Sequence, residues 1–213
     1  MSLSAHRKIT GIILAAGRST RMEKTKQLLP FGDSTILGTV IENALESDLD
    51  GITLVLGHEH KKIKNSLKEQ FRSYRFRIVV NPDYEKGQST SLICGIKSID
   101  SKTDAAMFLL GDLPCVGPRT IDQIISGFDP AFSDIVVPCF KGKRGNPVII
   151  SQALFPELET ISADTGARTL FSKYQNRLLK IEVDDPGILM DIDTPDDYNH
   201  VSDPLLWSQR SHR

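Results

Sequence analysis

The sequence lacks an excess of charge of either sign and any long hydrophobic run. Its 26 Lys and Arg residues nearly balance 27 Asp and Glu, which leaves a formal net charge of -1. A general nucleic-acid-binding protein needs a large cationic excess to neutralise phosphates, so we expect no nucleic-acid partner. The longest apolar runs, such as residues 105–110, are far too short to cross a bilayer, so we expect no membrane association.

Cysteine is scarce, and several familiar motifs are missing. The three cysteines form no CxxC pair and leave an odd count, which argues against a disulfide framework or a structural zinc site. Residues 1–8 have no apolar core like that of a signal peptide, and the cysteine usage favours a reducing compartment, so we expect a cytoplasmic protein. The chain has no G-x-x-x-x-G-K-[ST] phosphate loop, no G-x-G-x-x-G dinucleotide motif and no G-x-S-x-G hydrolase elbow.

Short apolar, β-branched runs alternate with amphipathic stretches along most of the chain. The predicted strands are Thr10–Ala15, Gly51–Leu56, Phe76–Val80, Ala105–Leu110 and Asp134–Pro138. The predicted helices are Ile36–Ser47, Lys61–Gln70, Ser89–Ile99 and Arg119–Phe128. The strand runs are apolar almost throughout, as expected where helices cover both faces of a sheet. This pattern predicts a single Rossmann-like α/β fold with a doubly wound, mainly parallel sheet.

The alternation ends near residue 138. Glycines and prolines then punctuate a less regular region, with short apolar runs at Leu178–Val183 and Ile188–Ile192. We interpret this region as extra strands and loops that close over the sheet edge. One domain is expected over residues 8–201, with terminal tails at 1–7 and 202–213.

Ligands of open parallel sheets bind beyond the carboxyl ends of the strands, so the residues that follow each strand carry the functional argument. After the first predicted strand come small residues, hydroxyl groups and four cations, Arg18, Arg21, Lys24 and Lys26. Small residues let a ligand approach the backbone N–H groups closely, and together with the positive charge this suits a polyphosphate. The alternative is a tight turn with solvated charges.

Two acidic groups follow apolar runs further along the chain. Asp112, in Gly111-Asp-Leu-Pro114, is well placed to hold Mg²⁺, although it could instead cap a turn or helix. Asp191 and Asp193 would share one face if the preceding strand continued that far. Alternatively, Asp193 or Thr194 caps a helix that has Pro195 in its first turn.

A third segment, Gly87–Leu92, follows the third predicted strand. Its small hydroxyl residues precede a helix, so exposed N–H groups there could recognise a base or sugar. Ser89 could equally cap that helix. His58 and His60 have no third ligand nearby, so a metal pair is disfavoured there.

Six motifs together resemble the nucleotidyltransferases of molybdenum cofactor biosynthesis, particularly the cytidylyltransferase branch. They are LAAGRSTRM with Lys26, GQSTSL, GDLP, RGNPV at Arg144–Val148, DTGAR at Asp164–Arg168, and DIDTP. They occur in the family's order from residue 10 to about 200. The sequence departs from the family at Glu23, which replaces a usual glycine, and at Asn146, where the branch often has His.

The resemblance implies a function and a set of site residues. It implies Mg²⁺-dependent transfer of CMP from CTP to a molybdopterin-type cofactor, with a molybdoenzyme or its chaperone as the partner that receives the product. Arg21, Lys26 and Asp112 are the implied catalytic residues, and Asp112 and Asp193 the implied metal ligands. The implied nucleotide-binding residues are Leu14, Ala15, Ala16, Gly17, Arg18, Ser19, Arg21, Lys26, Gly87, Ser89, Ser91, Gly111 and Asp112. The implied acceptor-binding residues are Pro114, Arg144, Gly145, Asn146, Pro147, Asp164, Gly166 and Arg168.

Three alternatives stay open at this point. Ala16 resembles the cytidine-using branch, whereas a second glycine there would resemble a GTP-using molybdopterin guanylyltransferase. A related nucleotidyltransferase acting on a sugar or polyol phosphate would share the triphosphate loop and the GDxP motif. A nucleotide-binding regulatory subunit without catalysis would be expected to lose the metal carboxylates or Lys26, and this chain keeps them.

Overall fold

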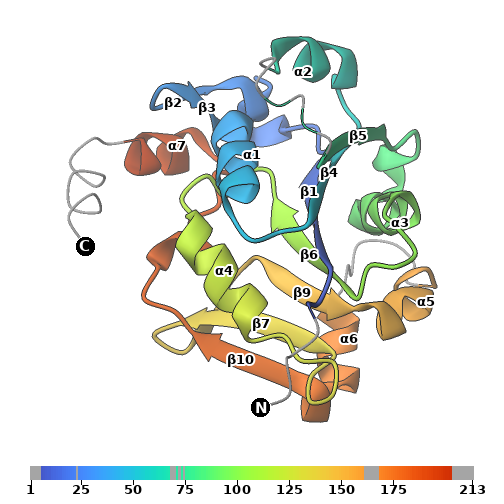
Figure 1. The fold of residues 1–213 in the computed structure, drawn as a ribbon. Coiled ribbons are helices and arrows are strands. Elements are labelled where there is room, and N and C mark those ends of the chain that lie inside the picture. Colours follow the sequence, from blue (N-terminus) through green and yellow to red (C-terminus); the bar gives the residue numbers. More distant parts are fainter. Residues whose placement is uncertain are drawn as a thin grey trace.

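The computed structural model describes residues 6–22, 24–67, 71, 73, 75–160 and 168–202. Its strands are β1 Ile9–Ala15, β2 Pro30–Phe31, β3 Ser34–Thr35, β4 Gly51–Leu56, β5 Phe76–Val80, β6 Ala105–Leu110, β7 Ile135–Phe140, β8 Lys143–Arg144, β9 Val148–Ser151 and β10 Leu178–Glu182. Its helices are α1 Ile36–Glu46, α2 His60–Ser66, α3 Gln88–Ser98, α4 Pro118–Ser126, α5 Phe155–Leu158, α6 Arg168–Lys173 and α7 Pro195–Val201. Figure 1 shows these elements around one central sheet.

The central sheet is mixed but mostly parallel. Its strand order is β10-β7-β9-β6-β1-β4-β5, and β8 pairs with β7 as a short antiparallel addition. Neighbouring strands from β6 to β5 are parallel, whereas β9 runs antiparallel to both β6 and β7. The fold class predicted from the sequence is therefore confirmed, with one antiparallel strand inside the sheet.

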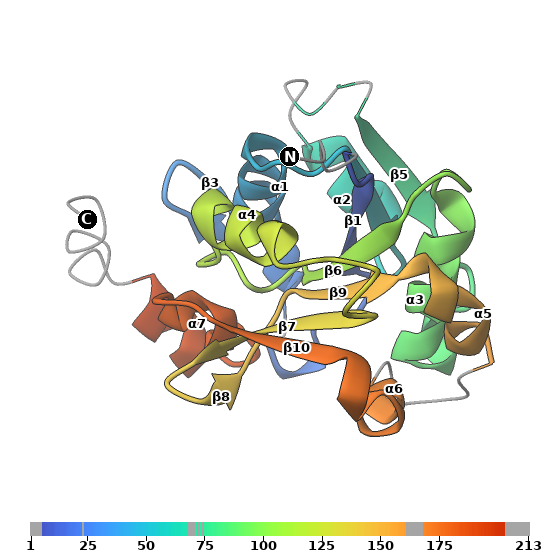
Figure 2. The same cartoon turned by 60° about the horizontal axis from the view of Figure 1, so that its bottom comes forward.

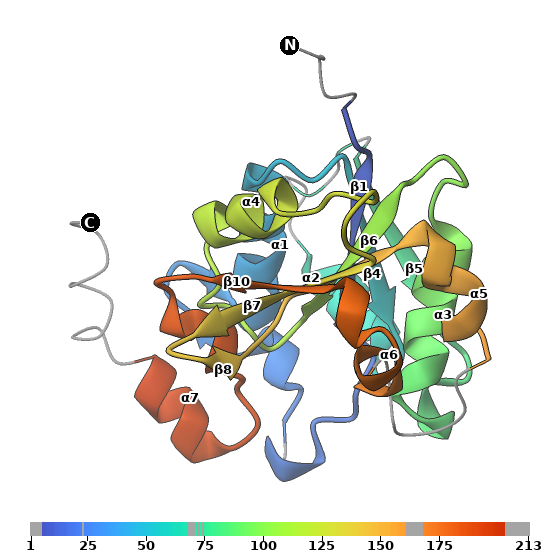
Figure 3. The same cartoon turned by 90° about the horizontal axis from the view of Figure 1, so that it is seen from below.

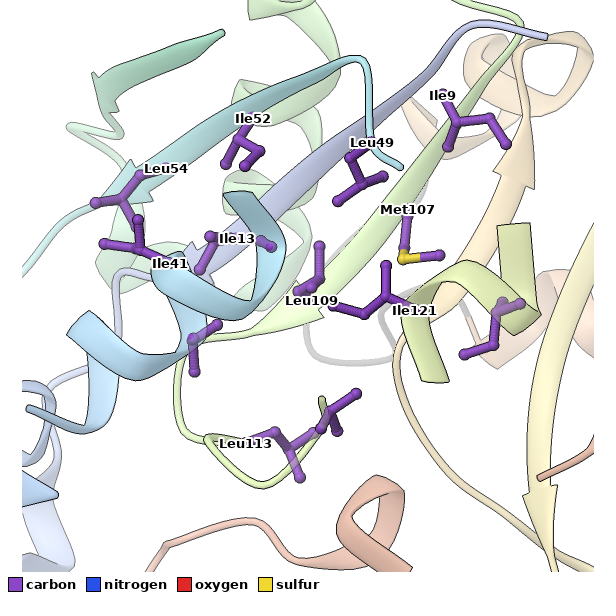
Figure 4. Close-up of a cluster of buried hydrophobic side chains, with 14 of the residues drawn as sticks. Ile9, Ile13, Ile41, Leu49, Ile52, Leu54, Met107, Leu109, Leu113 and Ile121 are labelled. Carbon is purple, nitrogen blue, oxygen red and sulfur yellow. The ribbon is translucent and has the colours of Figure 1, made fainter. Parts of the chain in front are cut away.

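Helices cover both faces of the sheet, as the apolar strands predict (Figure 3). On one face, α1 and α4 pack Ile41 and Ile121 against Ile13 and Met107 of the sheet, as the close-up shows (Figure 4). On the other face, buried residues of α3, α5 and α6 pack against strand residues such as Ile12 and Phe108. Alternate side chains of β1 and β6 thus enter two separate cores.

Three sequence predictions in the second half need correction. The strand predicted over Asp134–Pro138 begins one residue later and extends to Phe140. The extra strands were expected to close over the edge of the sheet. Instead, β9 lies inside the sheet between β6 and β7, and β10 forms the edge strand (Figure 2). The apolar run Ile188–Ile192 is not a strand: residues Pro186–Leu189 form a 3-10 turn, and Ile188 and Ile192 are buried in core clusters.

The helix predicted over Lys61–Gln70 corresponds to α2, which ends earlier than predicted. It starts at His60 and ends at Ser66, and residues 68–70 lie outside the described residues. No described helix is both long and apolar enough to span a membrane.

We expect Gly95→Ala in α3 to destabilise the protein. An added Cβ would lie 2.5 Å from Ile12 Cγ2 and 3.3 Å from Val55 Cγ2, and both atoms belong to stiff β-branched side chains of the core. Alanine normally stabilises a helix relative to glycine, but overpacking here should cost about 1–3 kcal/mol of unfolding free energy. Urea unfolding measures the change.

The matched control is Gly17→Ala, because a Cβ on Gly17 would have no heavy atom within 4 Å. Its unfolding free energy should stay within about 0.5 kcal/mol of wild type. Equal or greater stability of Gly95→Ala would contradict the packing argument.

Candidate active site

A cleft lies where the carboxyl ends of β1 and β6 meet the loops that follow β1 and β5. Its volume is about 580 Å³. Gly111, the residue after β6, has no room for a side chain: an added Cβ would lie 2.9 Å from Ala15 Cβ and 3.1 Å from the Leu14 carbonyl oxygen. The two strand ends therefore approach closely and bring Asp112 to the floor of the cleft.

Most of the predicted nucleotide-binding residues line this cleft. They are Leu14, Ala15, Ala16, Gly17, Arg18, Ser19, Arg21, Lys26, Gly87, Ser91, Gly111 and Asp112. Asp193 also lines the cleft, although it lies far from the others in sequence. Segments that follow four different parts of the sheet thus meet in one place.

Ser89 does not reach the cleft. It is 3% exposed within α3, and the N-cap of this helix is Gly87, which has a positive φ of 112°. A glycine adopts this backbone conformation readily, so the helix begins one residue before Ser89 without a side-chain cap. The interpretation of Ser89 as a cap is wrong.

The centre of the cleft is an ionic cluster around Lys26. Lys26 Nζ donates hydrogen bonds to Asp112 Oδ2 at 2.7 Å, to Asp193 Oδ1 at 2.8 Å and to the Ile192 carbonyl oxygen at 2.9 Å. Arg21 donates from Nη1 to Asp193 Oδ2 at 3.0 Å. The backbone N–H of Ile192 also donates to the Asp112 carbonyl oxygen at 3.1 Å, which fixes the two acidic segments side by side.

The ion pairs of the cluster shift the pKa values of its members in opposite senses. Burial lowers the pKa of Lys26, but the two carboxylates outweigh this effect and raise the pKa above its usual range. Burial raises the pKa of Asp112, and Lys26 opposes that rise. The hydrogen bond from Lys26 lowers the pKa of Asp193, which is the more exposed carboxylate.

The local structure decides between the alternatives for both acidic motifs. The carboxylate of Asp112 accepts from Lys26 instead of capping a helix, because the N-cap of α4 is Gly117. Asp193 does not lie on a strand. Thr194 is the N-cap of α7, with Pro195 in the first turn and a capping box closed by Asp197, so the helix-start interpretation is confirmed.

The cleft wall after β5 depends on Asn81, which is buried. Its side-chain Nδ2 donates to Thr90 Oγ1 at 2.8 Å and Ser91 Oγ at 3.0 Å, and its Oδ1 accepts from the backbone N–H of Asp83. These bonds hold the turn that carries Tyr84 and Glu85 into the cleft lining.

The predicted nucleotide-binding residues omit six that line the cleft: Thr20, Gln27, Tyr84, Glu85, Gln88 and Leu110. Arg18 forms an ion pair with Glu85, and its guanidinium lies 6.0 Å from the centroid of the Tyr84 ring. Thr20 and Gln88 lie within quoted sequence motifs, and Tyr84 and Glu85 follow the carboxyl end of a predicted strand.

The predicted acceptor-binding residues lie elsewhere or outside the described residues. Pro114, Arg144, Gly145, Asn146 and Pro147 are not among the residues that line the cleft. Arg144 packs its guanidinium 4.5 Å from the Phe171 ring centroid, and Pro147 faces a small apolar cavity beside α4. Asp164 and Gly166 lie outside the described residues, and Arg168 begins α6.

The cluster suits a divalent cation that receives part of its coordination from a substrate. Asp112 Oδ1 is buried and has no hydrogen-bond partner within the described structure, so one carboxylate oxygen remains available as a ligand. Among the described residues, no group of three or more His, Cys, Asp or Glu side chains could hold a metal ion. Mg²⁺ typically takes only one or two protein carboxylates together with substrate phosphates and waters, so Asp112 and Asp193 fit this ion.

Two named relatives match most of this chain. The chain is 31% identical over 199 residues to the purine catabolism protein PucB of Bacillus subtilis, covering 91% of this chain and 95% of PucB. It is 30% identical over 188 residues to the molybdenum cofactor cytidylyltransferase of Escherichia coli, covering 88% and 92% of the two chains.

Solved structures show the same fold. The crystal structure of Rv0371c from Mycobacterium tuberculosis superposes with a TM-score of 0.82 at 31% identity, covering 92% of this chain and 97% of that one. Another structure of that protein, at 29% identity, is a complex with manganese, covers 92% of this chain and 98% of that one, and has a TM-score of 0.77. A family model described as the MobA-like NTP transferase domain matches residues 11–178. The chain therefore belongs to the MobA-like NTP transferase family and is a nucleotidyltransferase.

Proposed function

We propose that this protein transfers CMP from CTP to the terminal phosphate of a molybdopterin-type cofactor and releases pyrophosphate. The observation that carries the proposal is the convergence of Lys26, Asp112 and Asp193 in one cleft beside the small-residue loop of β1. The Escherichia coli relative supports the choice of nucleotide and acceptor, because it matches most of both chains and is named a molybdenum cofactor cytidylyltransferase.

The reaction needs no side-chain nucleophile. An oxygen of the acceptor phosphate attacks the α-phosphorus of CTP, a new P–O bond forms, and the bond from the α-phosphorus to the bridging oxygen of pyrophosphate breaks. Catalysis then rests on positioning and on neutralising charge, as in other phosphoryl-type transfers. Bound Mg²⁺ would neutralise the phosphate oxygens at Asp112 and Asp193.

The cations of the cleft supply the remaining charge. The side chain of Arg21 is 69% exposed and pairs with Asp193 at its tip, so it can turn toward a triphosphate. Lys26 lies at the cleft floor, and both side chains offset negative charge that develops on the leaving pyrophosphate. The backbone at Ala15, Ala16 and Gly17 allows the close approach of the nucleotide that bulkier residues would prevent.

A second candidate is a nucleotidyltransferase of the same family with another acceptor or nucleotide. Two observations favour keeping it. The predicted acceptor residues Arg144–Pro147 do not line the cleft, and PucB is named for purine catabolism. A sugar or polyol phosphate acceptor, or GTP in place of CTP, would use the same cleft floor.

Pyrophosphate release by the purified protein tests the proposal. The assay contains Mg²⁺ with each of CTP, GTP, ATP and UTP, with and without a molybdopterin-type acceptor. We expect release that depends on both CTP and the acceptor. Turnover with a sugar 1-phosphate, or with GTP alone among the nucleotides, would replace the proposal with the second candidate.

We expect Asp112→Asn to lower kcat while the fold survives. The amide keeps the shape of the side chain but loses the charge that faces the metal and Lys26. Loss of one electrostatic group of this kind costs about 2.7–4 kcal/mol of barrier, roughly a hundred- to thousandfold in rate. Steady-state pyrophosphate release measures kcat.

Asp184→Asn provides the matched control, because Asp184 is exposed and is not among the cleft-lining residues. It removes the same charge from a position whose charge does not act on Asp112, and it should keep kcat within about threefold of wild type. An Asp112→Asn enzyme as active as this control would remove Asp112 from the mechanism.

A further inference from the structure

Lys26 uses all three of its N–H donors within the protein. A lysine ammonium has three donors and no acceptor. In this structure the three acceptors are a carboxylate oxygen of Asp112, a carboxylate oxygen of Asp193 and the carbonyl oxygen of Ile192. The Lys26 side chain is only 11% exposed. None of its donors is left for a phosphate while these bonds persist.

The four directly paired charges of the ionic cluster also balance without any ligand, and Asp191 adds one more negative charge near Asp112. Asp112 and Asp193 carry two negative charges, and Lys26 and Arg21 carry two positive charges that pair with them directly. A divalent cation that approaches Asp112 and Asp193 therefore meets two carboxylates that are already paired with cations. It must also approach a buried ammonium closely, and the repulsion between two cations is strong where little water screens it.

The buried oxygen of Asp112 indicates how the cluster can rearrange. Asp112 Oδ1 has no partner, whereas Oδ2 is taken by Lys26. Two carboxylates alone give a divalent cation few ligands, so phosphate oxygens must complete its coordination. A triphosphate offers those oxygens and is at the same time a polyanion that can accept hydrogen bonds from Lys26.

We propose that Lys26 is the resident counter-ion of Asp112 and Asp193, and that a divalent cation binds these carboxylates tightly only when a polyphosphate takes over the ammonium. Metal and nucleotide then strengthen each other's binding by the same factor, because coupling between two sites is reciprocal. This inference rests on the proposed function only in that the substrate carries a triphosphate.

The test measures Mn²⁺ binding to the protein in the absence of nucleotide, from the electron paramagnetic resonance signal of free Mn²⁺. Lys26→Met removes the counter-ion and leaves two uncompensated carboxylates, so it should bind Mn²⁺ at least tenfold more tightly than wild type. Lys24→Met is the matched control, because it removes an equal charge from an exposed side chain of the same loop. It should bind Mn²⁺ within twofold of wild type.

Further variants show which residue binds the additional Mn²⁺, and a spectroscopic measurement checks that each variant is folded. Lys26→Met combined with Asp112→Asn should return to the wild-type affinity for Mn²⁺, which locates the gain at Asp112. Lys26→Arg keeps the charge and should bind as weakly as wild type, whereas Lys26→Gln removes the charge, keeps a polar group and should bind as tightly as Lys26→Met. Circular dichroism confirms that each variant is folded.

Two results would overturn the inference. One is Mn²⁺ binding by folded Lys26→Met or Lys26→Gln that is no tighter than binding by Lys24→Met. The other is tight binding by wild type without nucleotide, equal to that of Lys26→Met. Neither measurement contains CTP or an acceptor, so a failure here is separate from a failure of the proposed function.

Discussion

The ion pairs of Lys26 are the interaction on which the candidate active site depends. They join a loop after β1 to residues 86 and 167 positions further along the chain. Removing a lysine and a carboxylate from water is costly, and the cost is offset only when geometry is good and hydrogen bonds are complete. Lys26 meets this condition with three acceptors. The site therefore exists only after β1 and β6 have paired and the segment that follows β10 has returned to them.

The strands whose boundaries depend on local sequence could be predicted. β4, β5 and β6 begin and end at the predicted residues, because each is a mostly apolar run bounded by turn residues. β9 escaped prediction, since Val148–Ser151 is four residues long and follows Pro147. Its place between β6 and β7 depends on pairing with distant strands. The run Ile188–Ile192 is apolar because Ile188 and Ile192 pack into hydrophobic cores. A 3-10 turn can bury such side chains as well as a strand can, so the apolar pattern does not distinguish the two.

In the candidate site, too, the features set by local sequence could be predicted and those set by contacts between distant segments could not. The cleft floor could be predicted, because in a parallel sheet the carboxyl ends of neighbouring strands share one edge. Local chemistry also fixed the start of α7 at Thr194-Pro195. By contrast, the contact between Arg18 and Glu85 joins two loops whose approach no short segment encodes. Serine is a common N-cap, which is why Ser89 was a candidate, but the helix begins after Gly87 and Ser89 is buried within its first turn.

The cations of the cleft differ in how far their side chains are exposed to solvent, and this difference affects the order in which a triphosphate can contact them. Arg18 and Arg21 lie at the mouth in exposed ion pairs, which water and salt weaken, so their exchange of a carboxylate for a phosphate costs little. Lys26 lies at the floor in a shielded pair, where the same exchange needs a compensating charge on the carboxylates. An incoming triphosphate can therefore engage the arginines first and Lys26 last, and the last exchange is the one that a divalent cation makes possible.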